Sequence, residues 1–354
     1  MGQAQGRALT PRLGSAAPSA LERETRIIEE LDRLVPRLLA ERRVPGASVA
    51  LIADGRLAWS RGYGVKTKGG DEPVDTSTIF ESGSLTKPVF AHAFLQFVDA
   101  GRIGLDTPLS EVVPTPFADD DPRASAITVR HALSHASGFP NWRGKDALKT
   151  TFEPGSKFQY SGEGYVYLSR AAEALTGRPV HEWLRDALLT PLGMSVSSFV
   201  WEDRFEALCA DGHGGEREVT EKWKPDTANV AASLHTTSSE YANVVIAMLE
   251  SPVESDGLVS EALWRESLRP QVVVDEGISW GLGWGLMDAA GHDTFWHWGE
   301  NSSYTCFVAA SRAEKRGVVV MTNSAYGHGI SQGVVEAVLG YEYPAFSSSL
   351  FTVW

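Results

Sequence analysis

Apolar residues recur along the first part of the chain with the spacing of a helix. Between residues 21 and 42 they lie three or four positions apart with charged residues between them, which predicts an amphipathic helix. Pro45 and Gly46 end this pattern. Residues 47–52 form an apolar, β-branched run, and the Asp54-Gly55 pair that follows is a hairpin signal. We therefore predict two antiparallel strands, at residues 47–52 and 56–65.

The middle of the chain has a different pattern. From Lys87 to about Pro270, amphipathic helical segments alternate with loops rich in Gly and Pro. These segments are residues 89–100, 128–133, 164–175, 180–188 and 239–249. After Ser279 the pattern changes to short β-branched or aromatic runs, which predict strands at residues 280–287, 294–298, 304–310 and 318–322. A helix at residues 330–339 is predicted to follow them.

Strands at both ends of the sequence enclose a helical block. The pattern predicts an α/β protein of the α+β type, with an antiparallel sheet built from both chain ends, flanked by helices, and a mostly helical domain inserted. We expect a flexible leader at residues 1–20, a sheet domain at 21–86 plus 271–345 and a helical domain at 87–270. Ligand sites commonly lie at such a seam between two parts.

Composition narrows the class of function. The 354-residue chain is 43% hydrophobic and 22% charged, and its net charge of -13 disfavours nucleic acid and anionic membranes as partners. No run approaches the ~20 apolar residues of a membrane span. The first 20 residues lack the apolar run of a secretory signal, so we expect a cytoplasmic protein unless a leader was removed. Cys209 and Cys306 have no metal or redox spacing and are expected to be free thiols.

A hydroxyl and an amine stand three residues apart in the segment Ser84-Leu85-Thr86-Lys87. Residues 80–83 have the pattern of a turn that leads into a helix, so both side chains are predicted on one face near a helix N-terminus. A serine needs a base to become a nucleophile, and a deprotonated lysine one turn away is such a base. The helix N-terminus favours developing negative charge. The alternative interpretation is a structural serine cap beside a solvated lysine.

Two further segments carry candidate chemistry. Tyr160 precedes Ser-Gly at the start of a predicted helix, and beside a lysine its phenol is expected to have a lowered pKa and to relay protons. His297 precedes Trp-Gly in a predicted strand, where a glycine lets another backbone or a ligand approach closely. Taken singly, each segment also fits a structural role, as a half-buried tyrosine or an incidental histidine on an edge strand.

Two histidines and a group of tryptophans are further candidates for metal or substrate binding. His131 and His135 stand four apart on a predicted helix, a spacing that can hold zinc, but the carboxylate of a His-Glu-x-x-His arrangement is missing. We therefore expect no metal and no cofactor. Of the eleven tryptophans most are expected in the core. A subset of four that stand close together is a candidate lining for an apolar acyl pocket: Trp280, Trp284, Trp296 and Trp298.

Together and in this order, the three segments resemble those of the β-lactamase-related, penicillin-recognising serine hydrolases. This family includes class C β-lactamases, low-molecular-weight DD-peptidases and β-lactamase-like esterases. The resemblance runs from about Val44 to Leu339. It extends to family-like phrases at residues 131–138, 154–158, 191–194 and 320–323. It implies a β-lactamase/transpeptidase-like fold and reaction through a serine acyl-enzyme.

The resemblance also implies a role for each matching position. Ser84 would be the nucleophile, and Lys87 and Tyr160 would share the general-base and general-acid work. His297 and Gly299 would lie on the strand that lines the acyl pocket. The backbone N–H groups of Ser84 and Glu300 would form the oxyanion hole.

A solvated lysine side chain has a pKa of ~10.4. Lys87 would therefore need a strongly lowered pKa, through burial or a nearby positive charge, to act as a base near neutrality. Gly162, Trp298 and Asn301 complete the positions that we assign to substrate binding.

Two positions depart from the family pattern. Typical members carry an Asn two residues after the tyrosine, whose amide holds the acyl-amide carbonyl of the substrate, and this chain has Gly162 there. The third motif often begins with a lysine suited to a substrate carboxylate, and here it begins with His297, which is mostly neutral near pH 7. Both departures favour an esterase or broad acyl hydrolase, acting on a small-molecule ester or amide.

Three alternatives remain open: a β-lactamase or DD-peptidase, an acyltransferase, and a catalytically silent ligand-binding protein of the same fold. The first two share the acylation step with an esterase, so the sequence does not separate them. A silent binding protein has no need of a nucleophile with its base. The sequence carries no signal for an oligomeric state.

Overall fold

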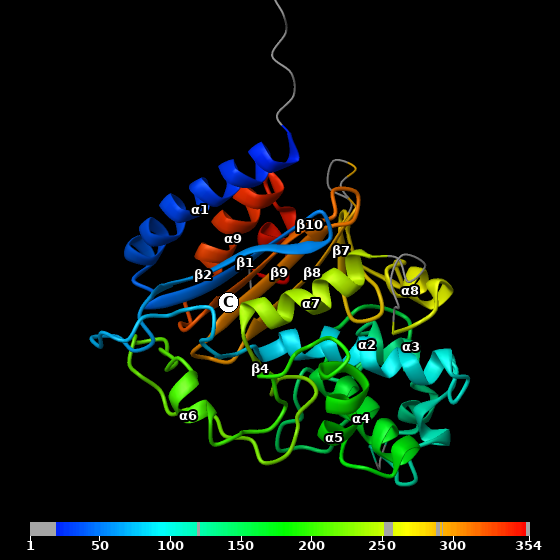
Figure 1. Cartoon of the computed structure of the whole chain (residues 1–354). Helices are drawn as coiled ribbons and strands as arrows, with labels where there is room; N and C mark the ends of the chain where they lie inside the picture. Colours follow the sequence, from blue (N-terminus) through cyan, green and yellow to red (C-terminus); the bar gives the residue numbers. More distant parts are fainter. Residues whose placement is uncertain (1–18, 119–120, 251–257, 288–290, 292, 352–354) are drawn as a thin grey trace, which may run out of the picture.

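The computed structural model describes residues 19–118, 121–250, 258–287, 291 and 293–351. At its centre lies an eight-stranded antiparallel sheet with the order β2-β1-β10-β9-β8-β7-β6-β5 (Figure 1). Its strands are β1 (Gly46–Ala53), β2 (Arg56–Gly64), β5 (Val272–Asp275), β6 (Ile278–Trp280), β7 (Gly285–Met287), β8 (Thr294–Glu300), β9 (Thr305–Ser311) and β10 (Arg316–Thr322). Both ends of the chain therefore supply strands, as the sequence predicts.

The central strands are apolar on both faces because helices cover both. Along β1, Val49 and Leu51 pack into the cluster under α1 (Ala20–Arg42) and α9 (His328–Leu339), whereas Ala50 and Ile52 point into the cluster shared with the helical block. Successive side chains of a strand alternate between faces, so a strand covered on both sides shows no polar alternation. Figure 1 shows α1 and α9 on one face of the sheet and α7 on the other.

The five predicted helical segments form where the amphipathic pattern places them. The helices of this part are α2 (Thr86–Asp99), α3 (Val129–Leu133), α4 (Gly162–Thr176), α5 (Val180–Leu184), which continues as a π-helical turn (Arg185–Leu189), α6 (Phe205–Leu208), α7 (Ser238–Leu249) and α8 (Glu261–Ser267). Of these, α6 and α8 are additional short helices that the sequence did not predict. A second, two-stranded sheet joins β3 (Phe80–Glu81) to β4 (His235–Thr236). Short 3₁₀ turns lie at Gly83–Leu85, Leu109–Glu111, Pro122–Ala126 and Pro344–Ser347.

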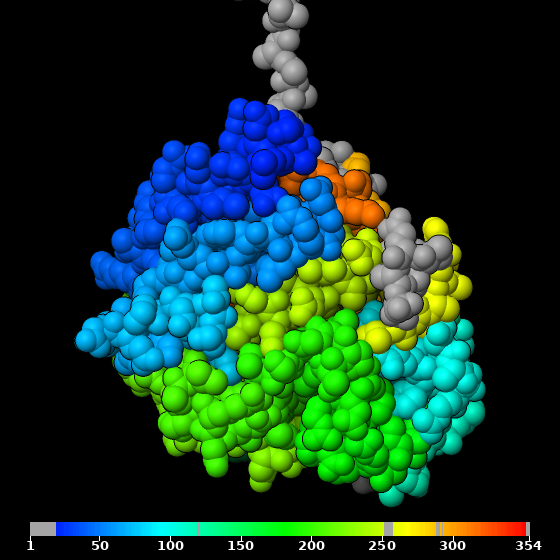
Figure 2. Space-filling view, viewed as in Figure 1, coloured from blue at the N-terminus to red at the C-terminus, as the bar shows by residue number. Residues whose placement is uncertain are grey.

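Helix α7 lies between the sheet and the rest of the helical block. It packs against β1 and β10, and Ser238 Oγ is 2.7 Å from Ser48 Oγ of β1. In Figure 2 its yellow-green surface separates the blue surface of β1 and β2 from the green helical segments. The sheet and the helical block thus share one hydrophobic core, and their division into two domains stays a proposal.

Two parts of the central sheet differ from the sequence prediction. The single strand expected at residues 280–287 is two short strands, β6 and β7, because Gly283 with φ +99° turns the chain between them. Strand β5 was not predicted, since its alternating side chains are half-exposed at the edge of the sheet. Most of the expected leader, residues 1–18, lies outside the described residues. Ser19 caps α1 through a capping box with Glu22, so the helix begins at Ala20.

Candidate active site

Ser84 is the one accessible residue of a buried segment. It lies in the middle of the 3₁₀ turn Gly83–Leu85 that leads into α2, and it alone is partly exposed among residues 78–95. Lys87 follows in the first turn of α2, and its Nζ is 2.9 Å from Ser84 Oγ and donates to Ala231 O at 2.9 Å. The structure therefore brings the predicted hydroxyl and amine into direct contact.

Burial disfavours the positive charge of the Lys87 amine. Complete burial places the pKa of Lys87 well below its usual range. Its Nζ lies among aromatic rings, 4.8 Å from the ring centroid of Tyr160 and 5.8 Å from those of Trp142 and Tyr165. A neutral amine has a free electron pair, so the lowered pKa favours the form of Lys87 that can act as a base for Ser84.

Tyr160 stands beside this pair, just before α4. Its ring lies 4.2 Å from that of His135 and 4.8 Å from that of Trp298. The hydroxyl is buried and has no hydrogen-bond partner of ordinary geometry among the described residues. Burial raises the pKa of the Tyr160 phenol, and the nearby Ser84 hydroxyl offsets this only in part. The predicted lowering of this pKa is wrong, because the phenol itself is buried and burial outweighs the contact with Ser84. A phenol that keeps its proton can still donate it.

His297 is a buried neutral residue of β8. Its Nδ1 is 2.6 Å from Trp298 O, and its Nε2 has no partner among the described residues. Burial is the main cause that lowers the pKa of His297, to about 3, and the neighbouring Lys87 acts in the same direction. No positive charge is therefore available at this position near neutral pH to attract a substrate carboxylate.

The end of β8 and the turn that carries Ser84 touch through two glycines. A Cβ on Gly299 would overlap Ser82 O, and a Cβ on Gly83, whose φ is +55°, would lie 2.6 Å from Glu300 N. Only glycines allow this approach, and it brings the backbone of Glu300 next to the nucleophile turn.

The register of the sheet fixes the direction of the Glu300 N–H group. Asn301 N–H donates to Tyr304 O at 3.1 Å, so Glu300 and its partner Thr305 form a non-hydrogen-bonded pair. The N–H of Glu300 therefore points away from β9, toward an edge that β7 leaves free, because β7 pairs with β8 only over residues 294–296. A carbonyl oxygen of a substrate can accept from this group.

Two cavities border the end of β8. One of about 290 Å³ is lined by Glu81, Trp223 and Asn301, and one of about 610 Å³ is lined by Glu300, His328 and Phe351. Asn301 does not face its cavity freely, because its Nδ2 donates to Glu81 Oε2 at 3.1 Å. The side chain predicted for substrate binding thus also ties β8 to the strand that precedes Ser84.

Glu81 is a buried carboxyl that the sequence did not single out. It accepts from Asn301 Nδ2 and from Trp223 N at 3.2 Å, but burial outweighs both contacts and raises its pKa to about 7. The folded state therefore binds a proton that the unfolded chain has already released between about pH 4.5 and pH 7. Glu81 stabilises the fold fully below this window, and the contribution is lost as the pH rises through about 7.

We expect Glu81→Gln to remove this pH dependence. The difference in free energy of unfolding between variant and native protein should grow by about 2–3 kcal/mol in favour of the variant from pH 5 to pH 8. Urea unfolding of both proteins at several pH values measures it. A difference that does not change with pH would show that Glu81 is ionised throughout.

Gly162, where family members carry an amide side chain, has no room for one. A Cβ there would lie 2.7 Å from Asn141 O and 2.8 Å from Cζ3 and Cη2 of Trp142. The indole of Trp142 therefore stands where a side chain at position 162 would project. The sequence did not identify Trp142, because nothing in the local pattern shows where a loop side chain points.

The tryptophans expected to line an acyl pocket belong to the core instead. Trp280, Trp284 and Trp296 are almost completely buried, and Trp298 is 4% exposed. Their prediction as pocket lining is wrong, since the indoles of Trp280, Trp296 and Trp298 pack in the cluster under α1 and α9. The exposed tryptophans near the site are Trp142 and Trp223, with 45% and 37% of their surface exposed.

The histidines considered for zinc have structural partners. His131 closes the capping box of α3 with Thr128, and His135 Nδ1 accepts from Ser161 N at 3.0 Å while its ring packs on Tyr160. Within the described part of the chain, no group of three His, Cys, Asp or Glu side chains is arranged to hold a metal. Cys209 and Cys306 are buried free thiols, as predicted.

The fold is that of the β-lactamase-fold serine hydrolases. The family model described as Beta-lactamase matches residues 31–339, and the chain belongs to this family.

Its relatives differ in their named activities. The chain is 29% identical to penicillin-binding protein 4 of Amycolatopsis lactamdurans, over 86% of this chain and 87% of that protein. It is 26% identical to esterase EstB of Burkholderia gladioli, over 84% of this chain and 90% of that one. Membership of the family therefore does not fix the particular reaction.

Solved structures show the same fold. An octameric penicillin-binding protein homologue from Pyrococcus abyssi superposes with a TM-score of 0.77 at 23% identity, covering 90% of this chain and 79% of that one. A class C β-lactamase gives 0.77 at 22% identity, with coverage of 90% and 96%. Among the described helices, none is both long enough and apolar enough to cross a membrane.

Proposed function

We propose that this protein is an esterase that forms an acyl-enzyme at Ser84. The observation that carries the proposal is the contact of 2.9 Å between the accessible Ser84 Oγ and the buried Nζ of Lys87. Neutral Lys87 takes the proton of Ser84 as Oγ forms a bond to the ester carbonyl carbon. The N–H groups of Ser84 and Glu300 stabilise the negative charge that develops on the carbonyl oxygen.

The leaving alcohol departs with a proton, and water then completes the cycle. Tyr160, whose phenol keeps its proton, and the Lys87 ammonium formed in the first step are the two donors within reach of Ser84. Once the alcohol has left, neutral Lys87 or the Tyr160 phenolate accepts a proton from the attacking water. The bond between Ser84 Oγ and the acyl carbon breaks, and the serine recovers its proton.

An ester is favoured over a β-lactam or a peptidoglycan stem by the residues around the pair. His297 is neutral and buried, so it attracts no substrate carboxylate, and Gly162 has no amide for an acyl-amide carbonyl. The relationship to a penicillin-binding protein keeps a DD-peptidase or β-lactamase as the second candidate. Acyl transfer to an alcohol or amine would use the same acyl-enzyme.

Covalent labelling tests the proposal directly. We expect a fluorophosphonate to add one adduct to the native protein, located at Ser84 by peptide mass spectrometry, and none to Ser84→Ala. Ser77→Ala, at an exposed serine outside the site, should be labelled like the native protein. Folded native protein without a label would favour a silent binding protein. Nitrocefin turnover faster than that of p-nitrophenyl acetate would favour a β-lactamase.

A further inference from the structure

Trp142 lies beside Lys87, the amine that contacts Ser84. Its ring centroid lies 5.8 Å from Lys87 Nζ, and its six-membered ring fills the space in front of Gly162. At 45% exposure, almost half of its surface is free to contact a ligand. Trp142 therefore presents an aromatic ring beside the pair of Ser84 and Lys87. Typical family members have a hydrogen-bonding amide in this place.

The neighbours of Trp142 hold it in place on both sides. Asn141 Oδ1 accepts from Gly162 N at 3.0 Å, and Asn141 O accepts from Glu163 N at 3.1 Å. Arg143 forms a 2.6 Å ion pair with Glu163, a carboxylate with only 4% of its side chain exposed. The two residues that flank Trp142 are thus fixed to the N-terminus of α4, so the indole needs little reorganisation to bind a ligand.

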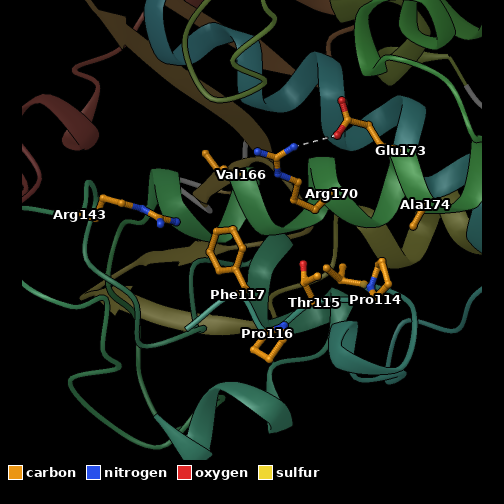
Figure 3. Close-up of a pocket in the computed structure, with 10 residues that line it drawn as sticks. Pro114, Thr115, Pro116, Phe117, Arg143, Val166, Arg170, Glu173 and Ala174 are labelled. Atoms are coloured by element: carbon orange, nitrogen blue, oxygen red, sulfur yellow. Dashed lines mark hydrogen bonds and ion pairs between the residues drawn. The ribbon is translucent and has the colours of Figure 1, made fainter. Parts of the chain in front are cut away.

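The far end of Arg143 faces a separate cavity. Its guanidinium lies 4.9 Å from the ring centroid of Phe117, and both line a space of about 560 Å³ beside α4 (Figure 3). Neither Ser84 nor Lys87 lines that space. The ion pair with Glu163 therefore serves to hold the loop, and substrate contact falls to Trp142.

An indole face selects a particular kind of acyl group. It offers apolar contact and stacking to a flat ring, whereas the polar amide of an acylamino group laid on this face would lose hydrogen bonds to water without replacement. We propose that Trp142 is the acyl-binding surface of this site and that it favours esters of flat aromatic carboxylic acids over acylamino acyl groups. This inference rests on the proposed esterase function and names its substrate class.

The experiment compares p-nitrophenyl benzoate with p-nitrophenyl acetate. We expect Trp142→Ala to lower the benzoate-to-acetate ratio of kcat/KM by about three- to tenfold, the worth of one aromatic pair. Trp142→Phe keeps a ring and should retain most of the ratio. Trp59→Ala removes a part-exposed tryptophan from β2, an edge strand of the sheet, and should leave the ratio unchanged. An unchanged ratio in Trp142→Ala would overturn the inference.

Two further variants test whether the Trp142 indole occupies the space that an amide side chain at position 162 would need. Gly162→Asn alone should lower turnover of both esters, because its side chain meets the indole. The double variant Trp142→Ala, Gly162→Asn relieves this contact and should raise turnover of an N-acetyl-D-alanyl ester relative to the benzoate. A double variant no better on that ester than Trp142→Ala would contradict the assignment.

Binding measurements separate this inference from the function on which it rests. If the native protein is not labelled at Ser84 and hydrolyses neither ester, the proposed function fails. The Kd of p-nitrophenyl benzoate for Ser84→Ala, with and without Trp142→Ala, then decides the inference without turnover. A Kd raised about three- to tenfold by loss of the indole supports it. An equal Kd overturns it.

Discussion

Lys87→Met is expected to lower kcat/KM for p-nitrophenyl acetate by about 10³–10⁴-fold, near the upper limit of what a general base contributes. Methionine fills the same buried space but has no electron pair basic enough to take the proton of Ser84. The native rate should rise with pH through the lowered pKa of Lys87 and then level off. Ester hydrolysis by native protein and variant from pH 5 to pH 9 measures both effects.

The same substitution should stabilise the protein. A lysine whose pKa is lowered on folding stays unprotonated while the unfolded chain takes up a proton, so native stability falls as the pH drops below ~10. Lys87→Met lacks this pH-dependent loss of stability. The free energy of unfolding of the variant should therefore exceed that of the native protein by an amount that grows from pH 9 to pH 6. Lost activity together with raised stability distinguishes a missing base from misfolding.

Lys66→Met is the matched control for this variant. Lys66 is also buried, at 7% exposure, but it pairs with Glu72 away from Ser84. We expect its replacement to leave ester turnover unchanged. If Lys87→Met retained activity within tenfold of native, another group would have to serve as the base, and Tyr160 would be the residue to change next.

The sheet and its flanking helices could be predicted from the sequence, because the spacing of apolar residues and the local composition determine these elements. The stripe of residues 21–42 and the Asp54-Gly55 turn each specify an element with their own residues. Residues 280–287 could not be divided correctly, since their aromatic side chains favour a strand throughout. The break depends on Gly283, which has a positive φ and lies so close to α2 that a Cβ there would be 2.5 Å from the Cβ of Ala91.

Some features of the candidate site could likewise be predicted from the sequence, and others depend on the folded structure. Ser84 and Lys87 are three residues apart within one helical turn, so their spacing in the sequence predicts their contact. The lowered pKa of Lys87 and the raised pKa of Tyr160 both follow from burial, which is a property of the whole fold. Trp142 reaches the site from a loop that Asn141 and Arg143 attach to α4, and only the assembled structure shows that attachment.

Gly299→Ala is expected to lower kcat for ester hydrolysis by about 10²–10³-fold, the effect of losing one oxyanion donor. The new methyl group would overlap Ser82 O and lie 3.1 Å from Leu85 N, so β8 and the nucleophile turn must move apart. Glu300 N–H then no longer faces the carbonyl oxygen bound at Ser84. Steady-state kinetics of p-nitrophenyl acetate hydrolysis, with thermal unfolding recorded alongside, measures the change.

Stability should fall less than activity in this variant. Overpacking of a core contact typically costs about 1–3 kcal/mol, which leaves a domain of this size folded. Gly215→Ala is the control, since a Cβ at that exposed loop position meets nothing within 4 Å. The pH profile of Gly299→Ala should keep its native shape, because Lys87 stays buried beneath Ser84. Native turnover in Gly299→Ala would show that the charge on the carbonyl oxygen is stabilised elsewhere, and unchanged stability would show that β8 does not press on the nucleophile turn.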